Sequence, residues 1–332
     1  MDFATFAYDT LGFLLRALIF VLVIGAILRS ASVYKPKAGR IRVTDMSDEL
    51  TRLKRIFKGP LLKKKGKSDE EDAKKISGKS YLLNFKGSIT AIEVDKLKRE
   101  VDAVIQGGDA KTDKVIITIE SPGGAVTGYG YAASQIERLR EAGFEVIASV
   151  DQVAASGGYL MASVANKIVA SKFAIIGSIG VVSQMPNFSR LLEKAGIDYE
   201  QITAGEHKRT LSMVKPNTDE AREKYTEELK AIHDIFKRHV QQYRPELNIE
   251  EIATGEYWLG EDALGKGLID GIMTSDELIM KEANVEDRQL LKVEFKRHKP
   301  IGKRLKGATA DIAVMIMERF QAKVHNPFEN IR

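Results

Sequence analysis

The chain has 332 residues, of which 44% are apolar, which is enough for one substantial folded core with appendages but not for several full domains. It contains no cysteine, which excludes disulfide bonds, a thiol nucleophile and cysteine-ligated zinc. Much of the net charge of +5 lies just after the N-terminal segment and near the C-terminus, so it does not indicate binding to nucleic acid.

Residues 11–28 form an apolar run, LGFLLRALIFVLVIGAIL, close to the roughly 20 residues that cross a bilayer as a helix. Its only charge, Arg16, lies near enough to one end for the side chain to reach the lipid headgroups. A buried core helix fits less well, because the run is apolar on all faces. A cleaved signal peptide fits less well too, because Asp2 and Asp9 precede the run. We predict a membrane anchor over residues 1–30.

Basic residues follow this run and none precedes it. Five Lys and Arg side chains lie between residues 29 and 42, so the positive-inside rule predicts that the body of the chain is cytoplasmic. Residues 31–78 are polar and highly charged, with KKKGK at 63–67 and DEED at 69–72. This composition predicts a solvated basic linker, with contact to anionic lipid as the alternative.

From about residue 79 the pattern becomes that of a folded α/β domain, predicted over residues 79–288. The run 81–89, YLLNFKGSI, suits a strand. Thr90 and Glu93 then have the spacing of a capping box in front of an amphipathic helix.

The next two strands each lead into a glycine turn. The run 114–120, KVIITIE, is followed by SPGG at 121–124 and by a predicted helix over 125–142. The run 144–150, FEVIASV, precedes ASGG and a helix that opens at Ser156. Alternating strands and helices predict a mostly parallel sheet. Because catalytic groups gather at the carboxyl ends of parallel strands, both turns are expected at the same edge of the sheet.

Ser156 is the candidate nucleophile of this edge. Gly157 and Gly158 after it remove side chains that would keep a substrate carbonyl from the backbone. A tight turn without a catalytic role has the same composition. A serine also needs a base, usually histidine, and of five histidines His207 alone lies outside the predicted long helix and the C-terminal region. A triad with His207 is therefore one hypothesis.

The apolar patterns of the remaining chain predict both strands and helices. These are a strand at 167–171, the segment IIGSIGVVS at 175–183, a long amphipathic helix over 217–243, compact glycine turns around a short helix at 255–272, and, in a basic C-terminal extension over 289–332, a strand at 290–295 and a helix around 312–320.

Four motifs, ESPGG, DQVAASGGY, GSIGVV and LGEDALGKGLIDGI, resemble those of the signal peptide peptidase A family of serine proteases. The resemblance covers about residues 80–280 and implies a ClpP/crotonase-like fold, peptide-bond hydrolysis by a Ser–Lys dyad, and no cofactor or metal. It implies an enzyme of the bacterial inner membrane that acts on signal-peptide remnants or other unfolded or membrane-derived peptides. It also favours a periplasmic body, against the charge pattern.

The resemblance also implies residue roles by position. Ser156 is the nucleophile, Lys208 the general base, and Ser178 the hydroxyl that orients the lysine. The oxyanion donors are the backbone amides of three glycines: Gly123, Gly124 and Gly157. Lys208 lies in the charged sequence EHKRT, and a lysine acts as a base only when burial keeps it neutral; otherwise it is an ordinary solvated cation.

Tandem relatives in this family carry two protease units, and their serine and lysine come from different units. The resemblance therefore implies a homo-oligomeric ring in which a neighbour lends Lys208 to Ser156. Two other classes stay open. A crotonase-type acyl-CoA enzyme would use a carboxylate on the same fold, and an inactive membrane scaffold would leave Lys208 exposed.

Overall fold

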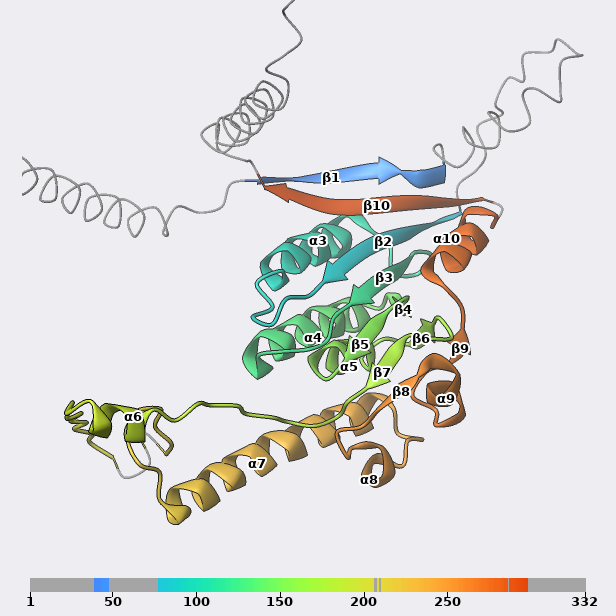
Figure 1. Ribbon diagram of the computed structural model, residues 1–332. Helices are drawn as coiled ribbons and strands as arrows, with labels where there is room; N and C mark the ends of the chain where they lie inside the picture. The colour runs from blue at the N-terminus through green and yellow to red at the C-terminus, as the bar shows by residue number, and fades with distance from the viewer. Residues whose placement is uncertain (1–38, 48–76, 206–207, 209, 286, 298–332) are drawn as a thin grey trace, which may run out of the picture. The chain divides into compact units, whose positions relative to one another are not determined.

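The computed structural model describes residues 39–47, 77–205, 208, 210–285 and 287–297, and residues 41–295 form one compact unit (Figure 1). The predicted membrane anchor, most of the linker and the predicted helix around 312–320 lie outside the described residues. No helix in the described part is long and apolar enough to cross a membrane.

The described residues form a seven-stranded sheet at the centre of this unit. In spatial order its strands are β1 (Gly39–Asp45), β10 (Arg288–Arg297), β2 (Gly78–Lys86), β3 (Lys114–Glu120), β4 (Glu145–Val150), β6 (Lys167–Ala170) and β9 (Gly271–Ile272). Every pairing from β10 to β9 is parallel. The predicted α/β class with a mostly parallel sheet is confirmed.

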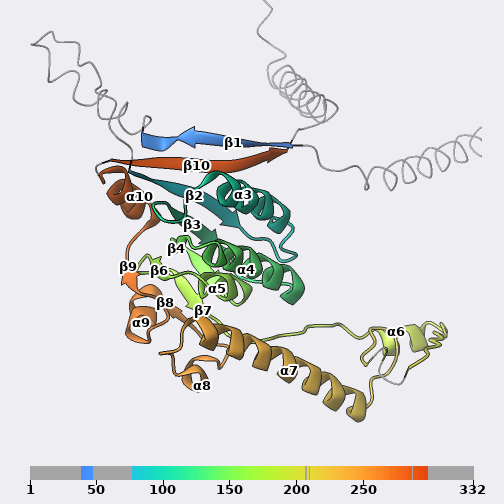
Figure 2. The same ribbon diagram turned by 180° about the vertical axis from the view of Figure 1, so that it is seen from behind.

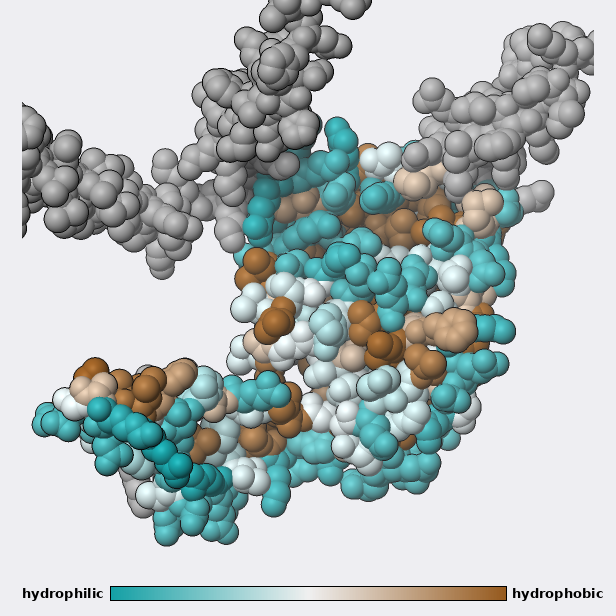
Figure 3. Space-filling view, viewed as in Figure 1, coloured by the Kyte–Doolittle hydropathy of each residue, from teal (hydrophilic) through white to brown (hydrophobic). Residues whose placement is uncertain are grey.

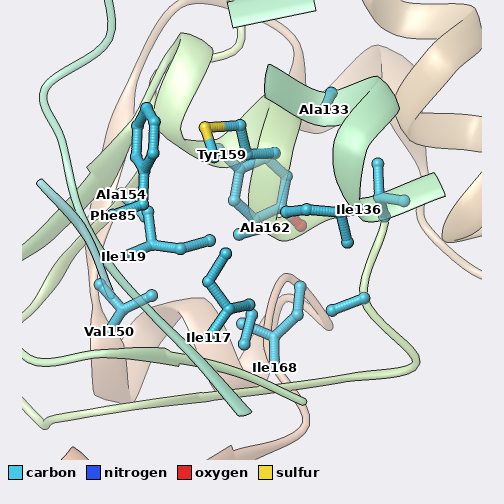
Figure 4. Packing of buried hydrophobic residues seen from close by; sticks show 14 of the residues in the cluster. Phe85, Ile117, Ile119, Ala133, Ile136, Val150, Ala154, Tyr159, Ala162 and Ile168 are labelled. Carbon is cyan, nitrogen blue, oxygen red and sulfur yellow. The ribbon is translucent and has the colours of Figure 1, made fainter. Parts of the chain in front are cut away.

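The central strands are apolar because both faces of the sheet are covered. Val115, Ile116 and Ile117 of β3 are all fully buried, although neighbouring side chains point to opposite faces. The larger cluster lies on the side of α3 (Val94–Gly107), α4 (Val126–Glu141) and α5 (Gly157–Ala162), and Figure 4 shows part of it. A smaller cluster on the other face packs under α10 (Ser275–Ala283).

A second sheet of three short strands lies beside the ends of the first. It consists of β5 (Val153–Ala155), β7 (Ile175–Gly177) and β8 (Tyr257–Leu259), in that order. β5 pairs in parallel with β7, and β7 pairs antiparallel with β8. An isolated bridge between Ser121 and Ala154 connects the end of β3 to β5. The short helix α9 (Gly260–Gly265) follows β8 within the predicted glycine turns.

The long helix α7 (Asp219–Tyr243) begins after Thr218, whose hydroxyl caps it by accepting from the Ala221 N–H. Only its C-terminal half is buried in the core, at Phe236 and Val240. Its N-terminal half is flanked by the segment between β7 and α7, which contains α6 (Ser189–Lys194) (Figure 2). The helix α8 (Ile249–Ile252) follows α7.

The predicted capping box at Thr90 and Glu93 is wrong. Helix α3 begins at Val94, and no side chain caps it. The Glu93 carboxylate instead accepts hydrogen bonds from the Ser88 N–H (3.1 Å) and the Ser88 hydroxyl (2.9 Å). Both bonds are accepted by the same Glu93 oxygen, Oε2, so Ser88 holds the carboxylate that a capping box would direct to the Thr90 N–H. A capping box is present at Thr274 of α10.

The strand β1 lies inside the segment predicted to be a linker. It is next to β10 in the sheet, and just beyond it the Ser47 hydroxyl accepts the Leu290 N–H at 3.0 Å. Its polar composition reflects an edge strand with largely exposed side chains.

Candidate active site

The pairing of β5 with β7 places Ser156 beside Ser178. Ala155 lies opposite Gly177 in this parallel register, so each serine is the first residue after its strand. The Ser156 N–H donates to the Gly177 carbonyl at 2.8 Å. The two predicted serines therefore meet at one edge.

Ser156 has a backbone conformation that is uncommon for a residue with a side chain. Its φ is 51° and its ψ is −119°, at the sharp turn from β5 into α5. Its carbonyl accepts the Leu160 N–H at 2.9 Å, which ties it to the first turn of α5, and its side chain is partly exposed. Strained backbone of this kind gathers at functional sites, where the surrounding fold enforces it.

Ser178 has a similar strained backbone, with φ 53°. Its N–H donates to the Glu256 carbonyl at 2.7 Å, and its hydroxyl donates to the Gly255 carbonyl at 3.4 Å. The Ser178 oxygen keeps lone pairs for another donor, since a hydroxyl has one proton and two acceptor positions.

The SPGG turn after β3 packs directly on Ser156. A Cβ on Gly123, whose φ is +92°, would lie 2.7 Å from the Ser156 Cβ and 2.8 Å from the Gly157 nitrogen. A Cβ on Gly124 would lie 2.1 Å from the Ile89 carbonyl oxygen. Only glycine fits at these two positions, which brings the turn's backbone against the serine. The Gly123 N–H itself donates to the Ser121 hydroxyl at 3.1 Å.

Two side chains that the sequence did not single out lie behind this turn. The Ser121 and Tyr129 hydroxyls are hydrogen-bonded to each other, and both residues are fully buried. Tyr129 also lies against Gly157, because a Cβ there would be 2.4 Å from the Tyr129 Cγ. Ser121 belongs to the recognised SPGG turn, but the position of Tyr129 follows only from tertiary packing.

Lys208 is exposed on the segment between β7 and α7. Its N–H donates to the Gly205 carbonyl at 3.3 Å, and Thr210 nearby donates to Glu228 of α7 at 3.1 Å. Within the part of the chain that the structure describes, Lys208 has no hydrogen bond to Ser156 or Ser178. His207, the other candidate base, lies outside the described residues.

Two histidines of α7 face the backbone beside the site. His233 Nε2 lies 3.1 Å from the carbonyl of Ile179, the residue after Ser178. His239 Nε2 lies 3.2 Å from the Leu160 carbonyl, and burial lowers the pKa of this imidazole. Among the described residues, no group of three His, Asp or Glu side chains could hold a metal ion.

Comparison with known proteins decides the family. Residues 138–289 match the family model "Peptidase family S49", and residues 5–136 match "Peptidase family S49 N-terminal". The chain is 37% identical over 337 residues to "Probable protease SohB" of Haemophilus influenzae, with 94% of each chain covered. The chain belongs to peptidase family S49.

Other relatives agree with this membership. "Probable protease SohB" of Buchnera aphidicola from Acyrthosiphon pisum is 44% identical over 254 residues, covering 76% of this chain and 70% of the relative. "Serine protease SPPA, chloroplastic" of Arabidopsis thaliana is 33% identical over 215 residues, covering 63% of this chain and 31% of the relative. The resemblance inferred from the four motifs is confirmed, and this S49 chain is SohB-like.

Proposed function

We propose that this S49 peptidase is a serine endopeptidase in which Ser156 is the nucleophile. The observation that carries the proposal is the turn at Ser156, where a partly exposed hydroxyl on a strained backbone has two glycines, Gly123 and Gly157, packed against it. Glycine at position 123 lets the backbone of the SPGG turn lie against Ser156, so backbone amides and not side chains flank the hydroxyl that a peptide carbonyl would approach.

The reaction follows from this arrangement. The Ser156 oxygen attacks the carbonyl carbon of the scissile peptide while a base takes its proton. The carbonyl oxygen becomes negatively charged and accepts hydrogen bonds from the Gly157 N–H and from a backbone N–H of the SPGG turn. Because the Gly123 N–H already donates to Ser121, we assign the turn's donor to the next amide, Gly124. The amine then leaves with the proton, and water, activated by the same base, hydrolyses the acyl-enzyme ester.

We propose Lys208 as the base, supplied by a neighbouring copy of the chain. A lysine must be buried to be neutral near pH 7, and Lys208 is exposed in the single chain. Its segment also exposes apolar side chains, which gather around α6 (Figure 3). The exposed apolar side chains of this segment include Val182 (78% exposed), Leu191 of α6 (64%) and Ile202 (94%). An apolar surface of this kind supports contact with another copy, which would bury the lysine as well.

Mixing two inactive variants tests the shared dyad. Ser156→Ala and Lys208→Ala chains are unfolded together, reassembled, and assayed against each variant reassembled alone. A shared dyad regenerates some sites that hold both Ser156 and Lys208, so part of the activity returns. A mixture that stays inactive, while wild type recovers in the same procedure, places both residues in one chain.

We propose a membrane anchor at residues 11–28 and signal-peptide remnants or other unfolded, membrane-derived peptides as substrates. The support is the length and composition of the apolar run and the family's resemblance, because an enzyme held at the bilayer meets such peptides as they leave it.

The proposal that Ser156 is the nucleophile is tested by cleavage of casein or a peptide library. Wild type is expected to cleave, and Ser156→Ala, with an unchanged circular dichroism spectrum, is expected to be inactive.

A further inference from the structure

A chain of hydrogen bonds runs from the SPGG turn into the core. The Gly123 N–H donates to the Ser121 hydroxyl at 3.1 Å, and that hydroxyl is bonded to the Tyr129 hydroxyl. The Tyr129 hydroxyl donates to the Ser88 carbonyl at 2.9 Å. These contacts connect the end of β3, the helix α4 and the loop after β2 behind the nucleophile.

The direction of each bond follows from the number of protons. The Ser88 carbonyl can only accept, so the single Tyr129 proton is given to it. The proton between the two hydroxyls is therefore that of Ser121, which donates to the Tyr129 oxygen. This leaves the Ser121 oxygen as the acceptor for the Gly123 N–H. Each hydroxyl donates one bond and accepts one, and the orientation of the Gly123 amide is fixed by the chain.

Tyr129 also touches the other side of the site. A Cβ on Gly157 would lie 2.4 Å from its Cγ and 2.7 Å from its Cβ, so the ring is in direct contact with the backbone after Ser156. Tyr129 is fully buried and makes an edge-on contact with Phe85, which fixes the ring. One side chain therefore supports both pieces of backbone that flank the serine.

We propose that Ser121 and Tyr129 are positioning residues for the oxyanion hole. Their hydrogen bonds hold the Gly123 N–H toward the core, which leaves the next N–H, that of Gly124, to face the reacting carbonyl. The Tyr129 ring, packed against Gly157, fixes the position of the Gly157 N–H. Neither side chain touches substrate. This inference rests on the proposed function, because it assumes that these amides stabilise the oxyanion formed by attack of Ser156.

Removal of either hydroxyl should lower kcat and leave KM within about twofold, since the oxyanion forms only in the transition state. Ser121→Ala takes away the acceptor of a buried N–H, and a loss on the order of 10- to 100-fold in kcat is expected. Tyr129→Phe keeps the ring against Gly157 and should cost on the order of 5- to 10-fold. Because both act through one chain, the double variant should lose little more than Ser121→Ala alone.

The matched control is Tyr159→Phe. Tyr159 is also fully buried, and its hydroxyl likewise donates to a backbone carbonyl, that of Leu268, at 2.8 Å. Both changes delete a buried hydroxyl that donates to a backbone carbonyl, and Tyr129→Phe also removes the acceptor of the Ser121 hydroxyl, so it should lower thermal stability by at least as much as Tyr159→Phe. Only Tyr129→Phe should lower kcat and weaken inhibition by a peptide aldehyde, whose adduct with serine places an oxygen in the same hole.

The full-length protein in detergent is assayed as wild type, Ser156→Ala and these variants. A selective fall in kcat for Ser121→Ala and Tyr129→Phe, with KM retained, supports the inference. If wild type is active and Ser156→Ala is not, but Tyr129→Phe behaves like Tyr159→Phe, the inference is overturned and the proposed function stands. If Ser156→Ala keeps wild-type activity, both are overturned. Should Ser121→Ala fail to fold, Tyr129→Phe decides the outcome alone.

Discussion

Glu100 is a fully buried carboxyl group between α3 and β10, and it should make the stability of the fold depend on pH. Its Oε1 accepts the Phe295 N–H at 2.8 Å and lies 3.5 Å from the Lys96 ammonium. Its Oε2 has no hydrogen-bond partner among the described residues. Burial raises the pKa of Glu100 from 4.5 to about 7, because the loss of hydration outweighs the hydrogen bond and the nearby lysine.

The direction and size of the effect follow from this raised pKa. Between pH 4.5 and about 7 the unfolded chain releases the Glu100 proton while the folded chain keeps it. Stability contributed by this group is therefore present at low pH and is lost as the pH rises through about 7. A pKa difference of this size corresponds to about 3 kcal/mol in the free energy of unfolding. For a domain of this size that is a Tm change of roughly 6–12 °C.

The perturbation is Glu100→Gln, because a neutral amide imitates the protonated carboxyl at every pH. Thermal unfolding is followed at pH 5 and pH 8, with the exposed Asp95→Asn on the same helix as the control. Glu100→Gln should resemble wild type at pH 5 and be more stable at pH 8 by about this amount. A Tm difference between Glu100→Gln and wild type that is the same at both pH values would refute the reasoning.

Three further predictions concern the site and the membrane. Gly157→Ala should cost about 1–3 kcal/mol in the free energy of unfolding and most of the activity, because the added methyl group meets the Tyr129 ring. The control is Gly130→Ala, whose Cβ meets nothing within 4 Å and which should behave like wild type in thermal melts and peptide assays. Lys208→Arg should be as inactive as Lys208→Ala, because a guanidinium does not deprotonate, and His207→Ala should keep most activity. An active Lys208→Arg together with an inactive His207→Ala would favour a histidine triad. If the basic residues after the apolar run set the topology, protease added to right-side-out vesicles should leave the folded domain intact, and its digestion would place the domain outside.

Much of the fold could be predicted because local patterns determine it. The strand β3 has the predicted bounds, since an apolar run that is buried on both faces needs no alternation to be recognised. The long helix ends at Tyr243 as predicted, two residues before Pro245. The capping box at Thr90 was wrong because the Ser88 donors engaged Glu93, a competition that the motif's spacing does not reveal.

The parts that could not be predicted depend on contacts between distant segments. The three-residue strand β5 is defined by its register with β7 and its bridge to Ser121, and a run this short has no periodicity of its own. The strand β1 pairs with a strand more than 240 residues away in the sequence. At the site, the glycine turns SPGG and ASGG were correctly expected at one edge of the sheet, but Tyr129 occurs in an ordinary helical sequence, and only the packing brings its ring against Gly157.

Labelling of the intact protein with a fluorophosphonate probe, followed by peptide mapping, tests most directly whether Ser156 is the nucleophile. Only a serine activated by its surroundings reacts with such a probe at an appreciable rate. We predict a single adduct on Ser156 in wild type, its loss in Ser156→Ala, and its loss when the protein is unfolded before labelling. An adduct on another residue, or labelling that persists undiminished in Ser156→Ala, would contradict the account.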